Sequence, residues 1–296
     1  MKIFTLLLFF ALGQATVYAQ TDTTYWRRSF SSGLNLNQAT FSDNWRAGGI
    51  NSIAIGLFSN GKADFKRERI SWDNEMQLQY GLFRNKGQDT RKNLDRIFLD
   101  TKYGYSISSD WNTFVSANFL SQFDRGFEYD VDSLPDNRRL ISNFLSPGFL
   151  TFALGLEFKP VDWFSVRFSP FAPRFTFLTD QNVRPNPNEV VYGVPVGRRV
   201  RQEWLAAQIL ANLNKDIATN LNLKLLYLGF ANYETLAWRN IDHRLDAVIT
   251  AKVNRLISVN ITGVALYDRD QDHQIQYSQA LALGVIYNIQ NFTDKK

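Results

Sequence analysis

Cysteine is absent from the 296 residues, histidine occurs only twice, and proline and glycine number 8 and 17. The absence of cysteine excludes a disulfide scaffold, a thiolate nucleophile or metal ligand, and a lipid anchor on an N-terminal cysteine. Proline and glycine are too few for a low-complexity chain. Beyond the N-terminus no apolar run approaches the roughly 20 residues of a membrane-spanning helix. Taken alone, these absences suggest a soluble periplasmic protein.

The N-terminus has the layout of an export signal. The basic Lys2 precedes an apolar run over residues 3–12, and small residues then lead to Ala19. This run is too short to span a bilayer. We therefore expect residues 1–19 to be a cleaved signal peptide and residues 20–296 to form one exported domain.

The sequence is rich in aromatic residues, at 15%, and in long alternating segments. From Ile70 to Leu82, apolar and polar side chains alternate, with the polar Asn74 interrupting the apolar phase. This alternation indicates a strand with one apolar and one polar face, and the segment is much longer than the five or six residues usual in soluble proteins.

Twelve strands are predicted in all, at residues 29–39, 50–65, 68–83, 94–107, 111–124, 148–159, 163–178, 202–215, 219–231, 239–252, 255–268 and 275–290. Short connectors alternate with long ones, as do the periplasmic turns and extracellular loops of bacterial outer-membrane barrels. We therefore predict an all-β fold, a closed antiparallel transmembrane β-barrel of about 12 strands, located in the outer membrane. A soluble sandwich or solenoid would also alternate, but the strand lengths argue against it.

The polar phase of these strands gives the predicted lining of the lumen. Its charged members are six acids and six bases: Asp73, Glu75, Arg96, Asp100, Lys102, Glu157, Arg167, Lys224, Asp242, Arg244, Asp246 and Lys252. Two interpretations stay open. The charges form a field along a solute path, or they pair with one another and stiffen a closed barrel. The balance of signs favours the second.

Catalysis in such a barrel would need a nucleophile and a base, usually histidine. His243 lies on the lipid-facing phase near the outer rim, and Ser258 on the paired strand points inward. His273 lies in a loop beside Asp270 and Asp272, a cluster more typical of a solvated turn than of a metal site. We expect a noncatalytic protein with no metal and no cofactor.

The predicted outer loops indicate possible partners. The segments 84–96 and 180–201 are rich in arginine, which suits the phosphates of lipopolysaccharide. The net charge of +5 is spread along the chain, and we expect no nucleic-acid partner. The loop 125–147 ends in a segment too apolar for a free surface loop, so we expect it to fold into the mouth or contact another protein. Its apolar residues are Leu140, Ile141, Phe144 and Leu145.

Pro170 and Pro173 lie inside the seventh predicted strand. Proline removes a ladder donor and is normally confined to strand edges and bulges, so we expect a kink or break in this strand.

Several short blocks of the sequence form a recognisable set: Asn44, Trp45, Gly48, Gly49, Trp72, Asn74, Ser142, Asn143, Pro147, Ser169 and Pro170. These blocks resemble an exported Bacteroidota family of outer-membrane β-barrels that is catalogued as a domain of unknown function. The resemblance covers about residues 26–290 and implies fold and location, without catalytic residues.

Three functions are compatible with these features. We rank first a noncatalytic subunit or structural partner in an outer-membrane protein assembly, because the predicted lumen is charge-balanced and the segment 140–147 is apolar. A small-solute channel is the alternative, and a lipid-modifying enzyme is third.

Overall fold

The computed structural model describes residues 25–42, 50–129, 131, 137–186, 188–254 and 257–291. The predicted signal peptide lies outside these residues. Among them, no helix is both long and apolar enough to cross a membrane.

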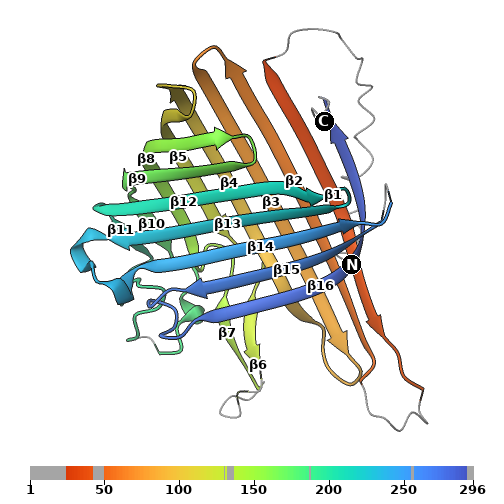
Figure 1. Cartoon of the computed structure of the whole chain (residues 1–296). Coiled ribbons are helices and arrows are strands. Elements are labelled where there is room, and N and C mark those ends of the chain that lie inside the picture. Colours follow the sequence, from red (N-terminus) through yellow and green to blue (C-terminus); the bar gives the residue numbers. More distant parts are fainter. Residues whose placement is uncertain are drawn as a thin grey trace.

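The described chain is almost entirely β-structure (Figure 1). Its strands are β1 (Trp26–Ala39), β2 (Ser52–Arg67), β3 (Ile70–Asn85), β4 (Arg91–Ser106), β5 (Trp111–Ser121), β6 (Gly126–Tyr129), β7 (Arg138–Ser142), β8 (Gly148–Val161), β9 (Phe164–Phe171), β10 (Arg174–Phe177), β11 (Val200–Glu203), β12 (Ala206–Ala218), β13 (Leu221–Asn232), β14 (Asp242–Lys252), β15 (Ile257–Tyr267) and β16 (Gln276–Gln290). Three 3-10 turns lie in the loops: η1 (Gln181–Val183), η2 (Tyr233–Thr235) and η3 (Trp238–Asn240).

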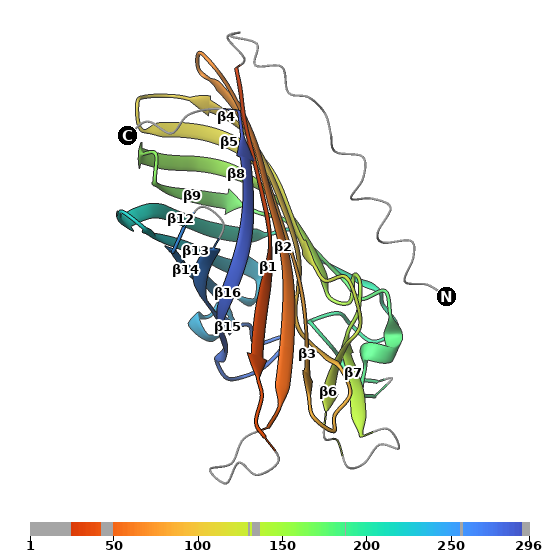
Figure 2. The ribbon, with the colours of Figure 1, turned by 90° about the vertical axis from the view of Figure 1, so that its right-hand side faces the viewer.

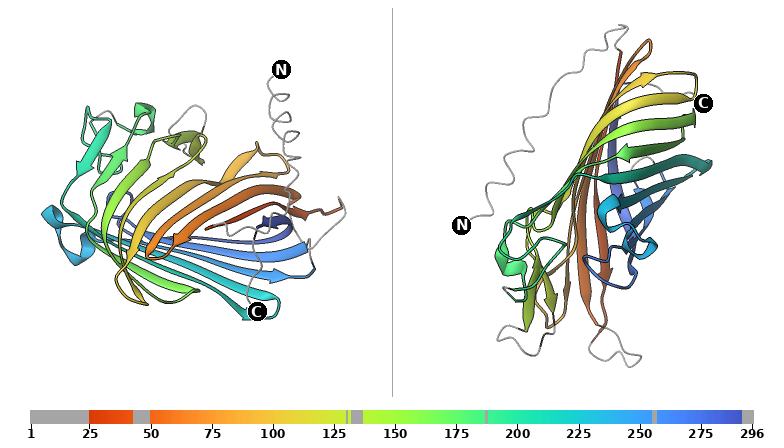
Figure 3. Two further views of the ribbon diagram at one scale, coloured as in Figure 1. Left: turned by 90° about the horizontal axis from the view of Figure 1, so that it is seen from above. Right: turned by 90° about the vertical axis from the view of Figure 1, so that its left-hand side faces the viewer.

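Twelve of these strands form a closed antiparallel barrel. Around the ring their order is β8, β5, β4, β3, β2, β1, β16, β15, β14, β13, β12 and β9, and β9 pairs again with β8. The first and last strands meet over the pairs from Ser29 with Gln290 to Leu36 with Leu283. Seen from above, the walls β1–β5 and β12–β16 face each other (Figure 3). The predicted barrel is confirmed.

The two faces of the barrel wall differ as the alternation predicts. Large apolar side chains stand exposed on the outside, among them Leu34, Leu36, Ile55, Leu57, Val115, Leu154, Phe168, Leu245, Leu281 and Leu283. Buried polar side chains lie on the inside, among them Gln77, Asp100, Lys102, Asn118, Glu157, Ser169 and Gln208. An apolar outer belt around a polar interior is the arrangement of barrels that span outer membranes.

Two strands of the ring are interrupted at their outer ends. The prolines Pro170 and Pro173 divide the seventh predicted strand into β9 and β10, which both pair with β8. The next strand is divided into β11 and β12, and β11 pairs with β10. The wall is continuous across the break because the amide of Ala172 donates to the carbonyl of Ala206 and that of Phe152 to the carbonyl of Pro173. The predicted break is confirmed.

The loop between β5 and β8 contains a hairpin, β6–β7, which the sequence did not predict. In Figure 2 this hairpin lies at the end of the barrel opposite the end at which β16 finishes. It therefore belongs to the long-loop end, which is extracellular in this class of barrel.

Candidate functional site

The lumen is the candidate site, and its charged residues are mostly paired. Eleven of the twelve residues predicted to line it form ion pairs with one another or with Lys62 and Arg174, which were not predicted. Lys252 is the exception among the predicted residues, and it is exposed near the end of β14. The structure thus brings eleven of these residues into ion pairs, and the side-chain phase could not specify which strands exchange them.

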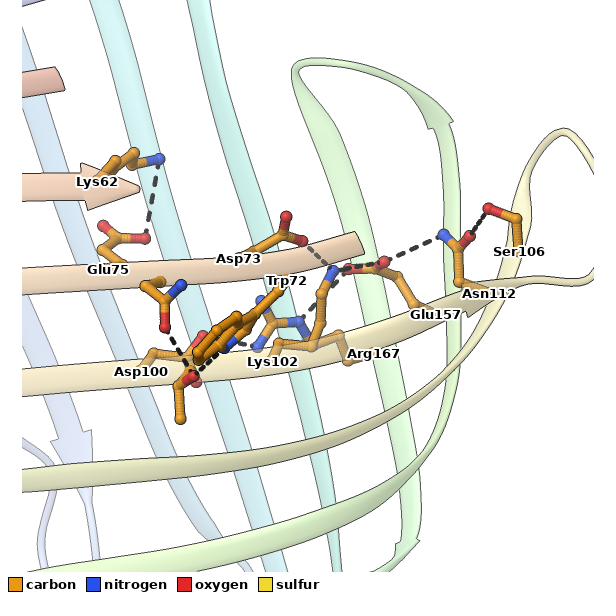
Figure 4. Close-up of polar contacts among 12 residues, drawn as sticks. Lys62, Trp72, Asp73, Glu75, Asp100, Lys102, Ser106, Asn112, Glu157 and Arg167 are labelled. Atoms are coloured by element: carbon orange, nitrogen blue, oxygen red, sulfur yellow. Dashed lines mark hydrogen bonds and ion pairs between the residues drawn. The ribbon is translucent and has the colours of Figure 1, made fainter. Parts of the chain in front are cut away.

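One layer of the lumen is a buried charge cluster centred on Lys102 and Glu157 (Figure 4). The Lys102 Nζ lies 2.7 Å from both carboxylate oxygens of Glu157 and 2.8 Å from Asp73 Oδ2. Arg167 joins the cluster by donating from Nη1 to Asp100 Oδ2 at 2.8 Å. Lys102 and Glu157 are each 3% exposed, so their mutual attraction acts where water screens it little.

Two ion pairs cross the barrel from wall to wall. Glu75 on β3 meets Lys224 on β13 at 3.0 Å, and Arg96 on β4 approaches Asp246 on β14 at 3.6 Å. In the ring of twelve, each of these strand pairs is separated by six positions and is therefore diametrically opposed. The lumen is flattened at this level and is bridged by side chains.

A cavity of about 330 Å³ lies in the lumen on the loop side of these bridges. We call it the outer cavity. Charged and apolar side chains both line it, including Arg96, Arg174, Arg244, Asp95, Asp242, Asp246, Asp268, Phe98, Leu120, Phe149, Leu226 and Leu228. Arg174 is held by Asp242 at 2.8 Å and lies over the ring of Phe230, 3.0 Å from its centroid.

The loops above the outer cavity form a lid with a small core of its own. We use the term lid for residues 138–147 together with 178–186 and 188–199. Leu178, Val183 and Val194 are buried together, and Leu140 and Tyr192 pack against them. The guanidinium of Arg184 donates to the carbonyls of Glu189, Val194, Pro195 and Arg198 and so closes the second lid segment on itself.

Tyr192 ties the two lid segments together. Its phenol donates to the carbonyl of Ile141 at 2.6 Å, and burial raises the pKa of Tyr192 to about 12. Of the four apolar residues predicted for a plug or partner segment, Leu140 and Leu145 are half-buried, whereas Ile141 and Phe144 are exposed. This segment therefore folds onto the mouth and still presents two apolar side chains outward.

The two histidines lie apart, His243 on β14 and His273 in the loop between β15 and β16. His243 Nδ1 lies 2.7 Å from the phenol oxygen of Tyr227, and its ring lies against those of Tyr227 and Tyr267 in the outer aromatic belt. His273 is exposed in its loop. Over the described ranges, no group of three or more metal-binding side chains is found.

The residues that carry the family resemblance are scattered over the fold. Asn44, Trp45, Gly48 and Gly49 lie outside the described residues. On the outer face, Trp72 Nε1 donates to Thr101 Oγ1 at 2.9 Å, and this hydroxyl donates to Asn74 Oδ1 at 2.8 Å (Figure 4).

The remaining members of this set support the lid and the strand break. Ser142 ends β7, Asn143 bonds Asp180 across the lid, and the carbonyl of Pro147 accepts from Gln122 at 3.0 Å. Ser169 is buried in β9, and the carbonyl of Pro170 accepts from the phenol of Tyr233.

Comparison with known proteins identifies one family model, described as "Protein of unknown function (DUF3078)", which matches residues 36–127. A resemblance to a family of unknown function is thus supported over these residues, and the Bacteroidota affiliation stays a prediction. No curated protein matches the chain.

Several solved structures share the general architecture. An outer membrane channel from Pseudomonas putida F1 has 6% identity and a TM-score of 0.40, with 89% of this chain and 95% of that chain covered. The NanC porin has 8% identity, a TM-score of 0.38 and coverage of 87% and 98%. The translocator domain of the autotransporter NalP from Neisseria meningitidis has 10% identity, a TM-score of 0.36 and coverage of 91% and 90%. These likenesses concern the fold alone.

Proposed function

We propose that this barrel is a narrow passage for small solutes across the outer membrane. The observation that supports this proposal is the position of the outer cavity, which lies under the lid and directly upon the Arg96–Asp246 bridge. A cavity above a charged constriction is the arrangement of a pore that binds a solute before passing it. A solute passes from the outer cavity through the constriction when it replaces one partner of an ion pair that bridges the lumen.

The bore expected for this strand number agrees with the proposal. Barrels of eight strands are filled by side chains, and those of 16–18 strands leave an open aqueous channel. A ring of twelve lies between these cases. The wall-to-wall ion pairs reduce the bore further, so we expect small and infrequent currents.

Planar-bilayer recording tests the passage. We expect the wild-type protein to conduct weakly, and the double variant Glu75→Ala with Lys224→Ala to conduct severalfold more because it removes a bridge across the bore. Both partners are replaced so that neither Glu75 nor Lys224 is left without the other. The matched control is Glu128→Ala with Arg139→Ala, an exposed ion pair of the β6–β7 hairpin. Currents no higher than background in the wild type and in the bridge variant would contradict the proposal.

A role in an outer-membrane assembly is the second candidate. The apolar residues that motivated it are partly used within the lid, where Leu140 packs on the lid core. It is still favoured by apolar side chains that the extracellular loops expose, including Ile141, Phe144, Val190, Leu236 and Trp238. Outer-membrane lipid and lipopolysaccharide are the other partners we propose, and we propose no catalytic role and no nucleic-acid partner.

A further inference from the structure

The arginines of the outer cavity are unequally neutralised. Arg174 Nη1 lies 2.8 Å from Asp242 Oδ2. Arg244 donates two hydrogen bonds to the carboxylate of Asp246, from Nε at 2.8 Å and from Nη2 at 2.9 Å. Arg96 approaches Asp246 only at 3.6 Å, and its Nε has no hydrogen-bond partner among the residues that the structure describes. Asp246 is thus already held by Arg244, and Arg96 keeps donor capacity for another anion.

A second spare donor lies on the neighbouring strand. Asn118 on β5 lines the same cavity, is 5% exposed, and has an Nδ2 without a hydrogen-bond partner in the described part of the chain. A buried donor without a partner has given up its hydrogen bond to water and gained none in return. A ligand with an acceptor at this position would supply that bond.

The carboxylates around the outer cavity already have hydrogen-bond or ion-pair partners. The carboxylate of Asp95 accepts from the amides of Phe123 and Asp124 and binds Lys92, and that of Asp268 accepts from the amide of Asp270 and the side chain of Gln271. A spare carboxylate oxygen, Asp100 Oδ1, belongs to a side chain that already holds Arg167. Asp100 itself does not line the outer cavity. Among the described residues that do, the buried side-chain atoms without a hydrogen-bond partner are the donors Arg96 Nε and Asn118 Nδ2, which favours an anion.

The rest of the lining is apolar. Phe98, whose ring centroid lies 5.1 Å from the Arg96 guanidinium carbon, shares the cavity with Leu120, Phe149, Leu226 and Leu228. Ligand sites commonly combine such apolar walls with a few convergent polar groups.

We propose that the outer cavity binds a small monocarboxylate with an apolar body. The carboxylate accepts from Arg96 and Asn118, since a guanidinium matches the planar geometry of a carboxylate. The apolar body lies against Phe98, Leu226 and Leu228. A small monocarboxylate would be the solute class of the proposed passage. The transport role of the site rests on the proposed function, whereas binding at the site is measurable without transport.

Calorimetric titration of the full barrel in amphipol tests the site with benzoate as probe. Benzamide and benzylamine have the same ring without the negative charge, and inorganic phosphate has the charge without the ring. We expect benzoate to bind and the other three to bind at least about tenfold more weakly, as the loss of charge-assisted hydrogen bonds or of apolar contact requires.

Two variants locate the binding. Asn118→Asp places a second carboxylate in the cavity lining, which repels a bound carboxylate, and Asn118→Leu removes the donor; each should weaken benzoate binding about tenfold or more. The control is Asn212→Leu, the same exchange on β12 outside the cavity lining. Retained mobility of the unboiled barrel on gels shows that each variant has folded.

The outcomes separate the two proposals. Equal binding of benzoate and benzamide, binding of phosphate alone, or unchanged binding in both Asn118 variants would overturn the carboxylate site. Benzoate binding without any conductance would leave the site intact and contradict the passage. Conductance without benzoate binding would support the passage and contradict the carboxylate site.

Discussion

A single carboxylate, Glu157, neutralises much of the positive charge buried in the lumen. Its oxygens accept from Lys102 at 2.7 Å, from Asn112 at 3.2 Å and from Arg167 at 3.4 Å. Removing one partner of a buried ion pair strongly destabilises a protein, because the other charge stays buried without compensation. Glu157 is therefore the residue at which a change in side-chain charge should cost the barrel most.

We expect Glu157→Ala to lower the free energy of unfolding by about 3–5 kcal/mol, because Lys102 would be left with Asp73 alone. Urea unfolding in lipid vesicles measures this change. Glu128→Ala, in an exposed pair with Arg139, should change the free energy by less than about 1 kcal/mol. Equal effects of the two substitutions would show that Glu157 does not hold the cluster together.

The alternation of the strands predicts individual lumen residues until a strand changes phase. Arg167 and Ser169 on β9 point inward at odd positions, whereas Arg174 and Thr176 on β10 are buried at even positions. The irregular residues between them shift the phase by one, and such a shift moves every following side chain to the other face. Arg174 was missed for this reason, although the two prolines marked where the shift would occur.

Among the elements, the lid depends on a few polar contacts between its two segments. Asn143 Nδ2 donates to Asp180 Oδ2 at 2.8 Å, and the Asp180 amide donates to Ser146 Oγ at the same distance. The bond from Asn143, together with those from the backbone and side chain of Asn182, holds the pKa of Asp180 below its ordinary value of 3.8. The charged carboxylate is therefore the form that keeps the lid segments joined.

Acid should loosen this contact. Because the pKa of Asp180 is lower in the folded lid than in the free chain, its contribution to stability is complete above pH 3.8 and is lost as pH falls through the lowered value. Asp180→Asn imitates the protonated state, so its lid amides should exchange hydrogen faster than those of the wild type at pH 7. The wild type should approach that rate only in acid. An unchanged exchange rate for the Leu178 and Thr179 amides in Asp180→Asn would contradict this role.

At the scale of the whole molecule, strand number, order and closure followed from sequence because each strand repeats one simple pattern. The β6–β7 hairpin and the lid did not, since the hairpin and the lid core of Leu178, Val183 and Val194 lie in irregular segments without periodicity. The bridges across the lumen were also beyond the sequence. Glu75 and Lys224 are 149 positions apart and meet only because strand tilt and closure bring opposite walls to one level.

The extracellular loops expose large apolar side chains, and whether these bind another protein determines whether the barrel functions as a monomer or in an assembly. Leu236 and Trp238 are 59% and 89% exposed, and Phe144 is 49% exposed on the lid. Large apolar side chains exposed on loops are candidates for contact with another protein. If these residues bind a partner, native mass measurement after mild detergent extraction should find the chain in a larger complex. The variant Phe144→Ser with Leu236→Ser and Trp238→Ser should shift it to the monomer. Leu154→Ala on the lipid-facing belt is the control and should leave the complex unchanged. A clean wild-type monomer in several mild detergents would exclude the assembly role and leave the passage as the function to pursue.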